Sequence, residues 1–255
     1  MINAEYIKTG VGRPLSVKIY DRTDSTNLRA KEYAVGCCED HTPVLFIARE
    51  QSAGRGRLGR QFLSRADSGI YMSLLYFTDT SLSDSVSVTT AAAVLVAEAL
   101  ENVICKRMMI KWVNDVYSQE GKVCGILTES IKVGEKNAII VGIGINTGNV
   151  DFPEELKGIA ATVGDVNGRE NEIIAHIVGE LLRLADDPVS REYMTGYRKR
   201  FMLRDQYVTL YSCGEAIGEG KVLDVTDDGG LVFLPDGKTE PEIIRSGEVT
   251  VRRRD

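Results

Sequence analysis

The chain has 255 residues, of which 43% are hydrophobic, and a formal net charge of −6. That length allows one large domain and a small one, and the acidic balance excludes a role based on overall attraction to nucleic acid or anionic membranes. The five cysteines include no C-x-x-C pair, which excludes a disulfide framework and a zinc knuckle. Without an apolar signal segment or an 18-residue apolar run, we expect a cytoplasmic protein that does not enter a membrane.

Strand and helix patterns alternate over the first two thirds of the chain. Short β-rich apolar runs predict strands at PLSVKIYD (14–21), VLFIAREQ (44–51) and GIYMSLLYF (69–77). A helix is predicted after the first strand, where Asp24 or Ser25 is placed to cap it. Longer apolar periodicity predicts helices over 84–103 and 171–187, the second continuing through REYMTGYRKRF.

Three further apolar segments, MMIKWV, KVCGILTES and NAIIVGIGIN, are spaced as meandering strands rather than crossover units. From about Asp205 short strands follow one another, with turns at D-D-G-G and P-D-G-K. We therefore predict an α+β fold with a mixed or antiparallel sheet over residues 1–204, and a small β-barrel over residues 205–255.

The stretch QSAGRGRLGR (51–60) concentrates glycine and arginine. It matches G-x-G-x-x-G, but a dinucleotide-binding loop opens a helix, and RQFLSRADSG has no helical periodicity. It is not a Walker loop, because Gly59 is followed by Arg60 and Gln61 instead of Lys-Ser/Thr. Two interpretations remain: a solvated basic surface loop, or a flexible loop whose arginines bind phosphate.

For the second interpretation, Gly54 and Gly56 would let the backbone approach a ligand and adopt positive φ. Arg55, Arg57 and Arg60 would offer guanidinium forks to phosphate oxygens.

Motifs further along the chain leave the same choice between a solvated surface and a ligand-binding site. IKWVND (110–115) and GKVCGIL (121–127) carry Lys111, Asp115 and Lys122, each of which alone is more typical of a solvated surface than of a ligand site. Trp112, the single tryptophan, belongs to the core by default, although its charged neighbours suggest a pocket wall. The glycines that alternate in VGIGIN (141–146) indicate either close internal packing or the floor of a ligand site.

Together, DSTN (24–27), GRGRLGR, KWVND, GKVCGIL, VGIGIN and the C-terminal SGEVTVR (246–252) resemble the biotin protein ligases in order and spacing. The resemblance covers the chain from about residue 15, with one departure at Val113, where the family usually has proline. It implies a class II synthetase-like catalytic domain over residues 1–204 and an SH3-like barrel over 205–255. No room is left before it for the helix-turn-helix of repressor members, so the resemblance implies the monofunctional type, without DNA as a partner.

The resemblance also implies a reaction and a site. ATP and Mg²⁺ would activate biotin to biotinyl-5′-AMP, and biotin would pass to one lysine of a biotin carboxyl carrier protein. The catalytic residues implied are Arg57, Lys111, Asp115 and Lys122, with Asp115 either positioning Mg²⁺ or accepting a proton. Biotin is expected to contact Ser25, Thr26, Asn27, Gln51, Arg55, Gly56, Arg57, Lys122, Gly125 and Gly142. ATP or adenylate is expected to contact Arg55, Arg57, Arg60, Lys111, Trp112, Asn114, Lys122, Asn146 and Arg252.

Alternatives are a lipoate-type acyl-adenylate ligase of the same fold and a non-enzymatic biotin sensor. A sensor need not keep phosphate-side charges such as Lys111, Asp115 and Lys122. Members of the family occur as monomers and as homodimers, and the sequence does not choose between them.

Overall fold

A seven-stranded sheet forms the centre of the larger part of the protein. The computed structural model describes residues 1–36, 41–79, 85–187, 189–212, 214–245 and 249–253. The strands are β1 (Ser16–Thr23), β2 (Val44–Gln51), β3 (Gly69–Thr78), β4 (Met109–Lys111), β5 (Asp115–Tyr117), β6 (Lys122–Val133) and β7 (Lys136–Asn146). They are ordered β1-β2-β3-β7-β6-β5-β4. Only β1 and β2 run parallel among these neighbours, so the sheet is mixed, as predicted.

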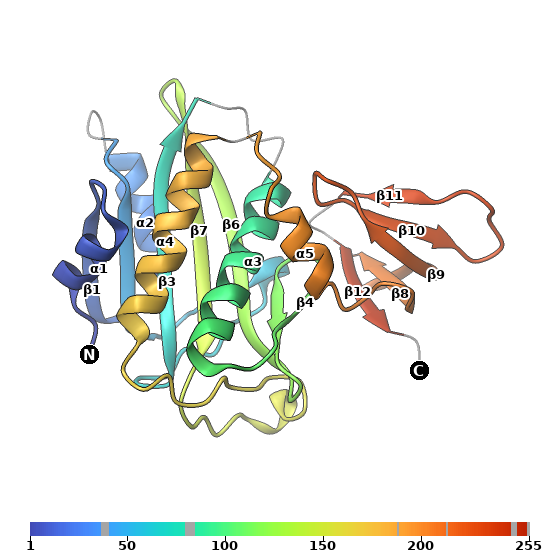
Figure 1. Cartoon of the computed structure of the whole chain (residues 1–255), viewed down its shortest axis with the longest axis horizontal. Coiled ribbons are helices and arrows are strands. Elements are labelled where there is room, and N and C mark those ends of the chain that lie inside the picture. Colours follow the sequence, from blue (N-terminus) through green and yellow to red (C-terminus); the bar gives the residue numbers. More distant parts are fainter. Residues whose placement is uncertain (37–40, 80–84, 188, 213, 246–248, 254–255) are drawn as a thin grey trace.

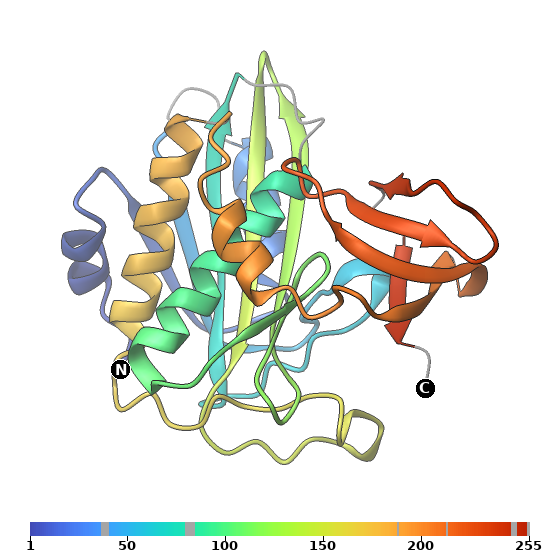
Figure 2. The same ribbon diagram turned by 45° about the vertical axis from the view of Figure 1, so that its right-hand side comes forward.

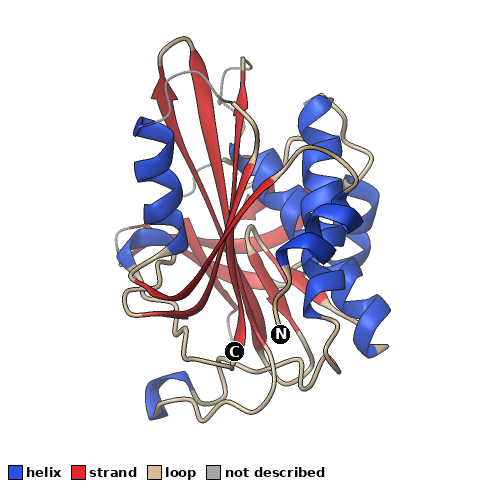
Figure 3. Cartoon of the chain, turned by 90° about the vertical axis from the view of Figure 1, so that its left-hand side faces the viewer, coloured by secondary structure: helices blue, strands red, loops and turns tan. Residues whose placement is uncertain are grey.

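Helices cover both faces of this sheet (Figures 1 and 3). The helices are α1 (Ala4–Val11), α2 (Thr26–Gly36), α3 (Ser85–Ile104), α4 (Glu170–Asp186) and α5 (Met194–Arg200). Helices α3 and α4 pack side by side over one face, with α1 against α4 and α5 against α3, and enclose the larger core. Helix α2 packs on the other face, where Ala30 and Ala34 join Phe46 and Leu75 in a smaller core.

Helix α3 is the most apolar helix in the described part of the chain. Its segment Val86–Ile104, with a mean hydropathy of 1.4, is long and apolar enough to cross a membrane, but 67% of it is buried inside the protein. The core helix of a soluble protein passes the same test, so the segment is weak evidence for a membrane span.

A second, antiparallel sheet follows at the C-terminus, beside the helical face (Figure 2). Its strands are β8 (Tyr207–Ser212), β9 (Glu215–Val225), β10 (Leu231–Pro235), β11 (Glu242–Ile244) and β12 (Val249–Arg253), in the order β11-β10-β9-β8-β12. The D-D-G-G turn between β9 and β10 reaches back to the first sheet, since the indole Nε1 of Trp112 donates to the Gly229 carbonyl over 2.8 Å. The second antiparallel sheet confirms the short strands predicted from about Asp205, and their closure into a β-barrel stays a prediction.

Several predictions about elements need correction. REYMTGYRKRF does not continue the helix before it, because α4 ends at Asp186 and α5 starts afresh at Met194. Proline at position 188 cannot supply the N–H that a continuing helix needs. Helix α1 and strand β11 were not predicted. The cap of α2 is Ser25, whose carbonyl accepts the first helical N–H, from Arg29, while Asp24 accepts the N–H of Ser25.

Candidate functional site

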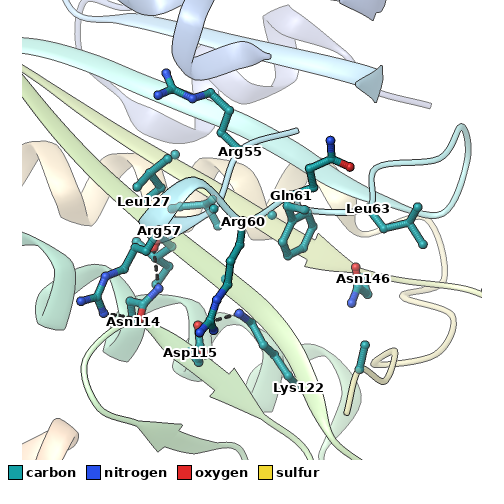
Figure 4. A pocket seen from close by; sticks show the side chains of 18 of the residues that line it. Arg55, Arg57, Arg60, Gln61, Leu63, Asn114, Asp115, Lys122, Leu127 and Asn146 are labelled. Carbon is teal, nitrogen blue, oxygen red and sulfur yellow. Dashed lines mark hydrogen bonds and ion pairs between the residues drawn. The ribbon is translucent and has the colours of Figure 1, made fainter. Parts of the chain in front are cut away.

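One cavity of about 310 Å³ opens where the central sheet meets the glycine–arginine loop. Its floor comes from β6 and β7, its inner end from the start of α2 and the end of β2, and its other end from β4 and β5. The loop after β2 lies across it (Figure 4). Segments far apart in the sequence therefore converge on one space.

The glycine–arginine loop folds as a tight hairpin. The N–H of Gly56 donates to the Arg60 carbonyl over 2.7 Å, and the N–H of Phe62 donates to the Gly54 carbonyl over 2.9 Å. The positive φ angles lie at Leu58 (56°) and Gly59 (72°), so the expectation of positive φ at Gly54 and Gly56 was wrong. Gly54 serves close packing instead, since a Cβ there would lie 2.3 Å from the Phe62 carbonyl oxygen.

The inner end of the cavity is a hydrogen-bonded polar corner. Gln51 Oε1 accepts from the backbone N–H of Thr26 over 2.8 Å, and Gln51 Nε2 donates to Ser64 Oγ over 2.9 Å. Ser25, Thr26 and Asn27 are all buried at this corner, where α2 begins. Buried polar groups are held only where they are paired, so this corner can hold a polar ligand in a defined orientation.

The opposite end is cationic. Of the described residues that line the cavity, those at this end with charged side chains are Arg57, Arg60, Lys111 and Lys122 against Asp115, whereas Arg55 pairs with Glu129 near the polar corner. Because the whole chain is acidic, this local excess marks the end suited to a polyanion. Figure 4 shows Arg57 and Arg60 pointing toward Asn114 and Asp115, with Arg55 on the other side of the loop.

The charged groups at this end are mutually positioned. Arg57 Nη1 donates to Asn114 Oδ1 over 2.9 Å, and Asn114 Nδ2 donates to the Ile126 carbonyl over 2.8 Å. Lys122 Nζ lies 2.7 Å from Asp115 Oδ1. Burial lowers the pKa of Arg57 from its ordinary value, with the nearby Asp115 charge working against that shift. An arginine stays protonated at neutral pH in any case, so burial keeps its charge poorly hydrated and available to a ligand.

The floor glycines leave room for other side chains. A Cβ on Gly142 would lie 2.0 Å from Asn27 Oδ1, and one on Gly144 would lie 2.5 Å from the ring of Phe62. A Cβ on Gly125 would approach Lys122 Nζ to 3.2 Å. The close-packing interpretation of Gly142 and Gly144 is therefore confirmed. Both glycines also line the cavity, and their role as the floor of a ligand site stays a prediction.

The structure brings together nearly all the residues expected at the site. Those that line the cavity are Ser25, Thr26, Asn27, Gln51, Arg55, Gly56, Arg57, Arg60, Lys111, Trp112, Asn114, Asp115, Lys122, Gly125, Gly142 and Asn146. Trp112 both lines the cavity and belongs to the core, at 5% exposure. The peptide bond that joins it to Val113 is cis. Arg252 pairs through its backbone with Thr209, and its side chain lies outside the described part of the structure, as do residues 246–248 of SGEVTVR.

Sequence reasoning missed some residues at the site. Phe62 lies against Gly144 on the floor, and Ser73 of β3 is fully buried beneath the polar corner. Glu129 of β6 contacts both Asn27 and Arg55. Phe62 directly follows the loop and offered a positional signal, whereas Ser73 and Glu129 stand inside apolar strands and only strand pairing brings them here.

Solved structures of biotin protein ligases share this fold. The biotin protein ligase from Aquifex aeolicus in complex with biotin and ATP matches with a TM-score of 0.76 and 29% identity, over 94% of this chain and 99% of that one. The biotin protein ligase from Leishmania major in complex with biotinyl-5-AMP matches with a TM-score of 0.57 at 18% identity, over 91% and 99%, which is a likeness of fold. The fold class is therefore that of the biotin protein ligases.

Sequence relatives lead to the same class. The bifunctional ligase/repressor BirA of Bacillus subtilis (strain 168) is 33% identical over 227 residues, 84% of this chain and 68% of the relative. The biotin–[acetyl-CoA-carboxylase] ligase of Paracoccus denitrificans is 39% identical over 127 residues, 49% of this chain and 52% of the relative. Residues 19–146 match the profile of the biotin/lipoate A/B protein ligase family, and the chain belongs to that family.

Proposed function

We propose that this protein is a biotin protein ligase that activates biotin with ATP and transfers it to a lysine of a biotin carboxyl carrier protein. The observation that carries the proposal is the polarity of the cavity, which has a hydrogen-bonding corner at one end and a cluster of cations at the other. Biotin has a polar ureido ring at one end and a carboxylate at the other, so the corner suits the ring and the cations suit the carboxylate with ATP.

In the first step a biotin carboxylate oxygen forms a bond to the α-phosphorus of ATP, and the bond from that phosphorus to the pyrophosphate oxygen breaks. Two anions must approach one another, so the barrier falls where fixed cations offset their repulsion. Arg57 and Lys122 face the cavity beside Asn114 and Asp115, and Lys111 lies on the adjoining strand β4. These three side chains would contact the reacting carboxylate and the phosphates.

In the second step the amine of the carrier lysine attacks the carbonyl of the mixed anhydride, and AMP leaves. The attacking amine must lose a proton. Asp115 is the carboxylate that lines the cavity among the described residues, and accepting that proton is one of two alternative roles for it, the other being to position Mg²⁺.

Magnesium is expected with ATP. No cluster of three or more histidine, cysteine or acidic side chains suited to a metal occurs among the described residues. Proteins usually bind Mg²⁺ through one or two carboxylates, while phosphates and water supply its other ligands. A single carboxylate among the described residues of the cavity fits this arrangement, and Asp115 would be that carboxylate. The ion would supply charge neutralisation on the phosphates.

The same proposal extends to the organisation of the chain. Residues 1–204 would form the catalytic domain and residues 205–255 an SH3-like domain whose Arg252 reaches ATP. The hydrogen bond between Trp112 and Gly229 supports a functional coupling of the two domains, because it joins a turn of the second sheet to a wall of the cavity. We propose a cytoplasmic location, where carrier protein and ATP are both present.

The test is a titration of the purified protein with biotin, followed by ATP and Mg²⁺ with pyrophosphate measured, and then by a carrier domain. Biotin binding, pyrophosphate release and label on the carrier are expected. Lipoate serves as the matched substrate control. Activity with lipoate but not with biotin would keep the family and overturn the substrate, and binding without pyrophosphate release would indicate a sensor.

A further inference from the structure

A chain of buried hydrogen bonds runs beneath the polar corner of the cavity. Ser73 on β3 has no exposed surface. Its Oγ lies 2.7 Å from Thr26 Oγ1 and 2.6 Å from Asn27 Oδ1. On the far side, Asn27 Nδ2 donates to the Leu127 carbonyl over 3.2 Å and to Glu129 Oε2 over 3.0 Å.

The direction of each hydrogen bond in this chain follows from the chemistry of its members. A carbonyl and a carboxylate can only accept, so they fix the Asn27 amide with its NH₂ toward β6 and its oxygen toward Ser73. Ser73 Oγ donates to the amide oxygen Oδ1 of Asn27 and to Thr26 Oγ1. Thr26 Oγ1 in turn donates to Gln51 Oε1 over 3.2 Å.

One consequence follows for the corner. Asn27 has both amide protons and its oxygen engaged within the protein, so these partners hold its amide in one orientation.

Glu129 ends the chain and connects it to the loop. Its second carboxylate oxygen, Oε1, lies 3.5 Å from Arg55 Nη1, and its side chain is 19% exposed. The one carboxylate thus holds the Asn27 amide with one oxygen and the glycine–arginine loop with the other. A charged acceptor strengthens both contacts relative to a neutral one.

We propose that Glu129 is a positioning residue, acting through Asn27 to orient the polar corner and through Arg55 to hold the loop over it. This rests on the proposed function, because the ligand of the corner is taken to be the ureido ring of biotin. Glu129 itself contacts no substrate in this account. Binding of the ureido ring and closure of the loop would then both depend on the Glu129 carboxylate.

The first test replaces Glu129 with glutamine, which has one acceptor oxygen for two donors. We expect Glu129→Gln to raise the KM for biotin about tenfold, as loss of a charged hydrogen bond does, with a smaller change in the KM for ATP. Ser73→Ala should shift the same constant in the same direction, because it leaves Asn27 Oδ1 without its donor. The matched control is Glu135→Gln, an exposed glutamate in the turn between β6 and β7.

A second readout uses the protein without ligands. Trypsin should cut after Arg55, Arg57 and Arg60 about fivefold faster in Glu129→Gln than in the wild type, the effect of roughly one net hydrogen bond on loop opening. A wild type that releases no pyrophosphate with biotin would overturn the proposed function and this assignment together. An active wild type whose Glu129→Gln variant keeps its KM for biotin and its cutting rate would overturn the assignment alone, even if its unfolding temperature fell.

Discussion

Trp112 Nε1 donates a hydrogen bond of 2.8 Å to the carbonyl of Gly229, and this contact joins a wall of the cavity to the second sheet. Gly229 has a φ of +81°, and a Cβ there would lie 2.8 Å from Val86 Cγ1 and 3.1 Å from Thr90 Cγ2 on α3. The turn that contains Gly229 therefore packs against both α3 and the indole of Trp112. Asn114 and Asp115 lie two and three residues after Trp112, so their placement depends on this junction.

Gly229→Ala should destabilise the protein more than Gly237→Ala. Both glycines have positive φ, +81° and +78°, but a Cβ on Gly237 meets nothing within 4 Å. Backbone conformation should therefore cost about 1 kcal/mol at each position, and overpacking against α3 should add about 1–3 kcal/mol at Gly229 only. Urea unfolding of both variants measures the difference in free energy of unfolding. Equal losses would show that the turn at Gly229 accommodates the added Cβ without a steric cost.

Gly142→Ala should remove biotin binding while Gly218→Ala should not. A Cβ on Gly142 would lie 2.0 Å from Asn27 Oδ1, which is itself fixed by two neighbouring strands. Gly218 is also a strand glycine, on β9, where a Cβ would meet Phe233 at an ordinary 3.9 Å. Calorimetric titration with biotin compares the two, and unchanged affinity in Gly142→Ala would mean that Asn27 moves freely.

Arg57→Ala should slow biotin adenylation by roughly 10²-fold, the effect of removing one preorganised charge-stabilising donor. Arg57 reaches the cavity from the loop and donates to Asn114. Arg169→Ala is the control, because this arginine pairs with Glu172 at the start of α4. The rate of pyrophosphate release is the measurement, and a variant with the wild-type rate would contradict the role given to the loop.

The loop should become protected from protease when its ligands bind. Leu58 at its tip is 48% exposed, which leaves the loop without an apolar anchor. Biotin with ATP should slow trypsin cutting after Arg55, Arg57 and Arg60, whereas cutting after the exposed Lys238 should stay the same. If both sites were protected equally, the ligand would act on global stability and not on the loop.

The stability supplied by Glu101 should depend on pH. Burial by itself would raise the pKa of this carboxyl, but hydrogen bonds from Arg200 and the Met108 N–H, with the Arg200 charge, hold it below its ordinary value of 4.5. A lowered pKa stabilises the folded state above pH 4.5, and this contribution is lost as the pH falls through the lowered value. Glu101→Gln should therefore cost roughly 1–2 kcal/mol at pH 7 and little near pH 2. Urea unfolding at both pH values measures this loss of unfolding free energy. An equal loss at pH 7 and near pH 2 would contradict a stabilising role for the ionised carboxylate.

Much of the fold could be predicted because its signals are local. VLFIAREQ coincides with β2, and the helix over 171–187 is displaced by one residue, since period-2 and period-3.6 burial patterns are written in contiguous residues. The boundary between α4 and α5 was missed because the residues on both sides favour helix, and the proline at position 188 was not given enough weight as a helix breaker. The cavity residues were expected through a resemblance that joins several motifs. Spacing alone left the charged residues among them consistent with a solvated surface, and left Trp112 and the strand glycines consistent with core packing.

By itself the sequence determined most of the strand and helix segments, the glycine–arginine loop and the identity of the charged groups around it. Only the tertiary structure decided which glycines need positive φ, where Trp112 points, and that Ser73 and Glu129 lie beneath the polar corner. The physical reason is that side-chain hydrogen bonds between a helix and the sheet beneath it join residues far apart in the chain, such as Asn27 on α2 and Glu129 on β6. Such partners depend on sheet order and helix packing rather than on sequence spacing.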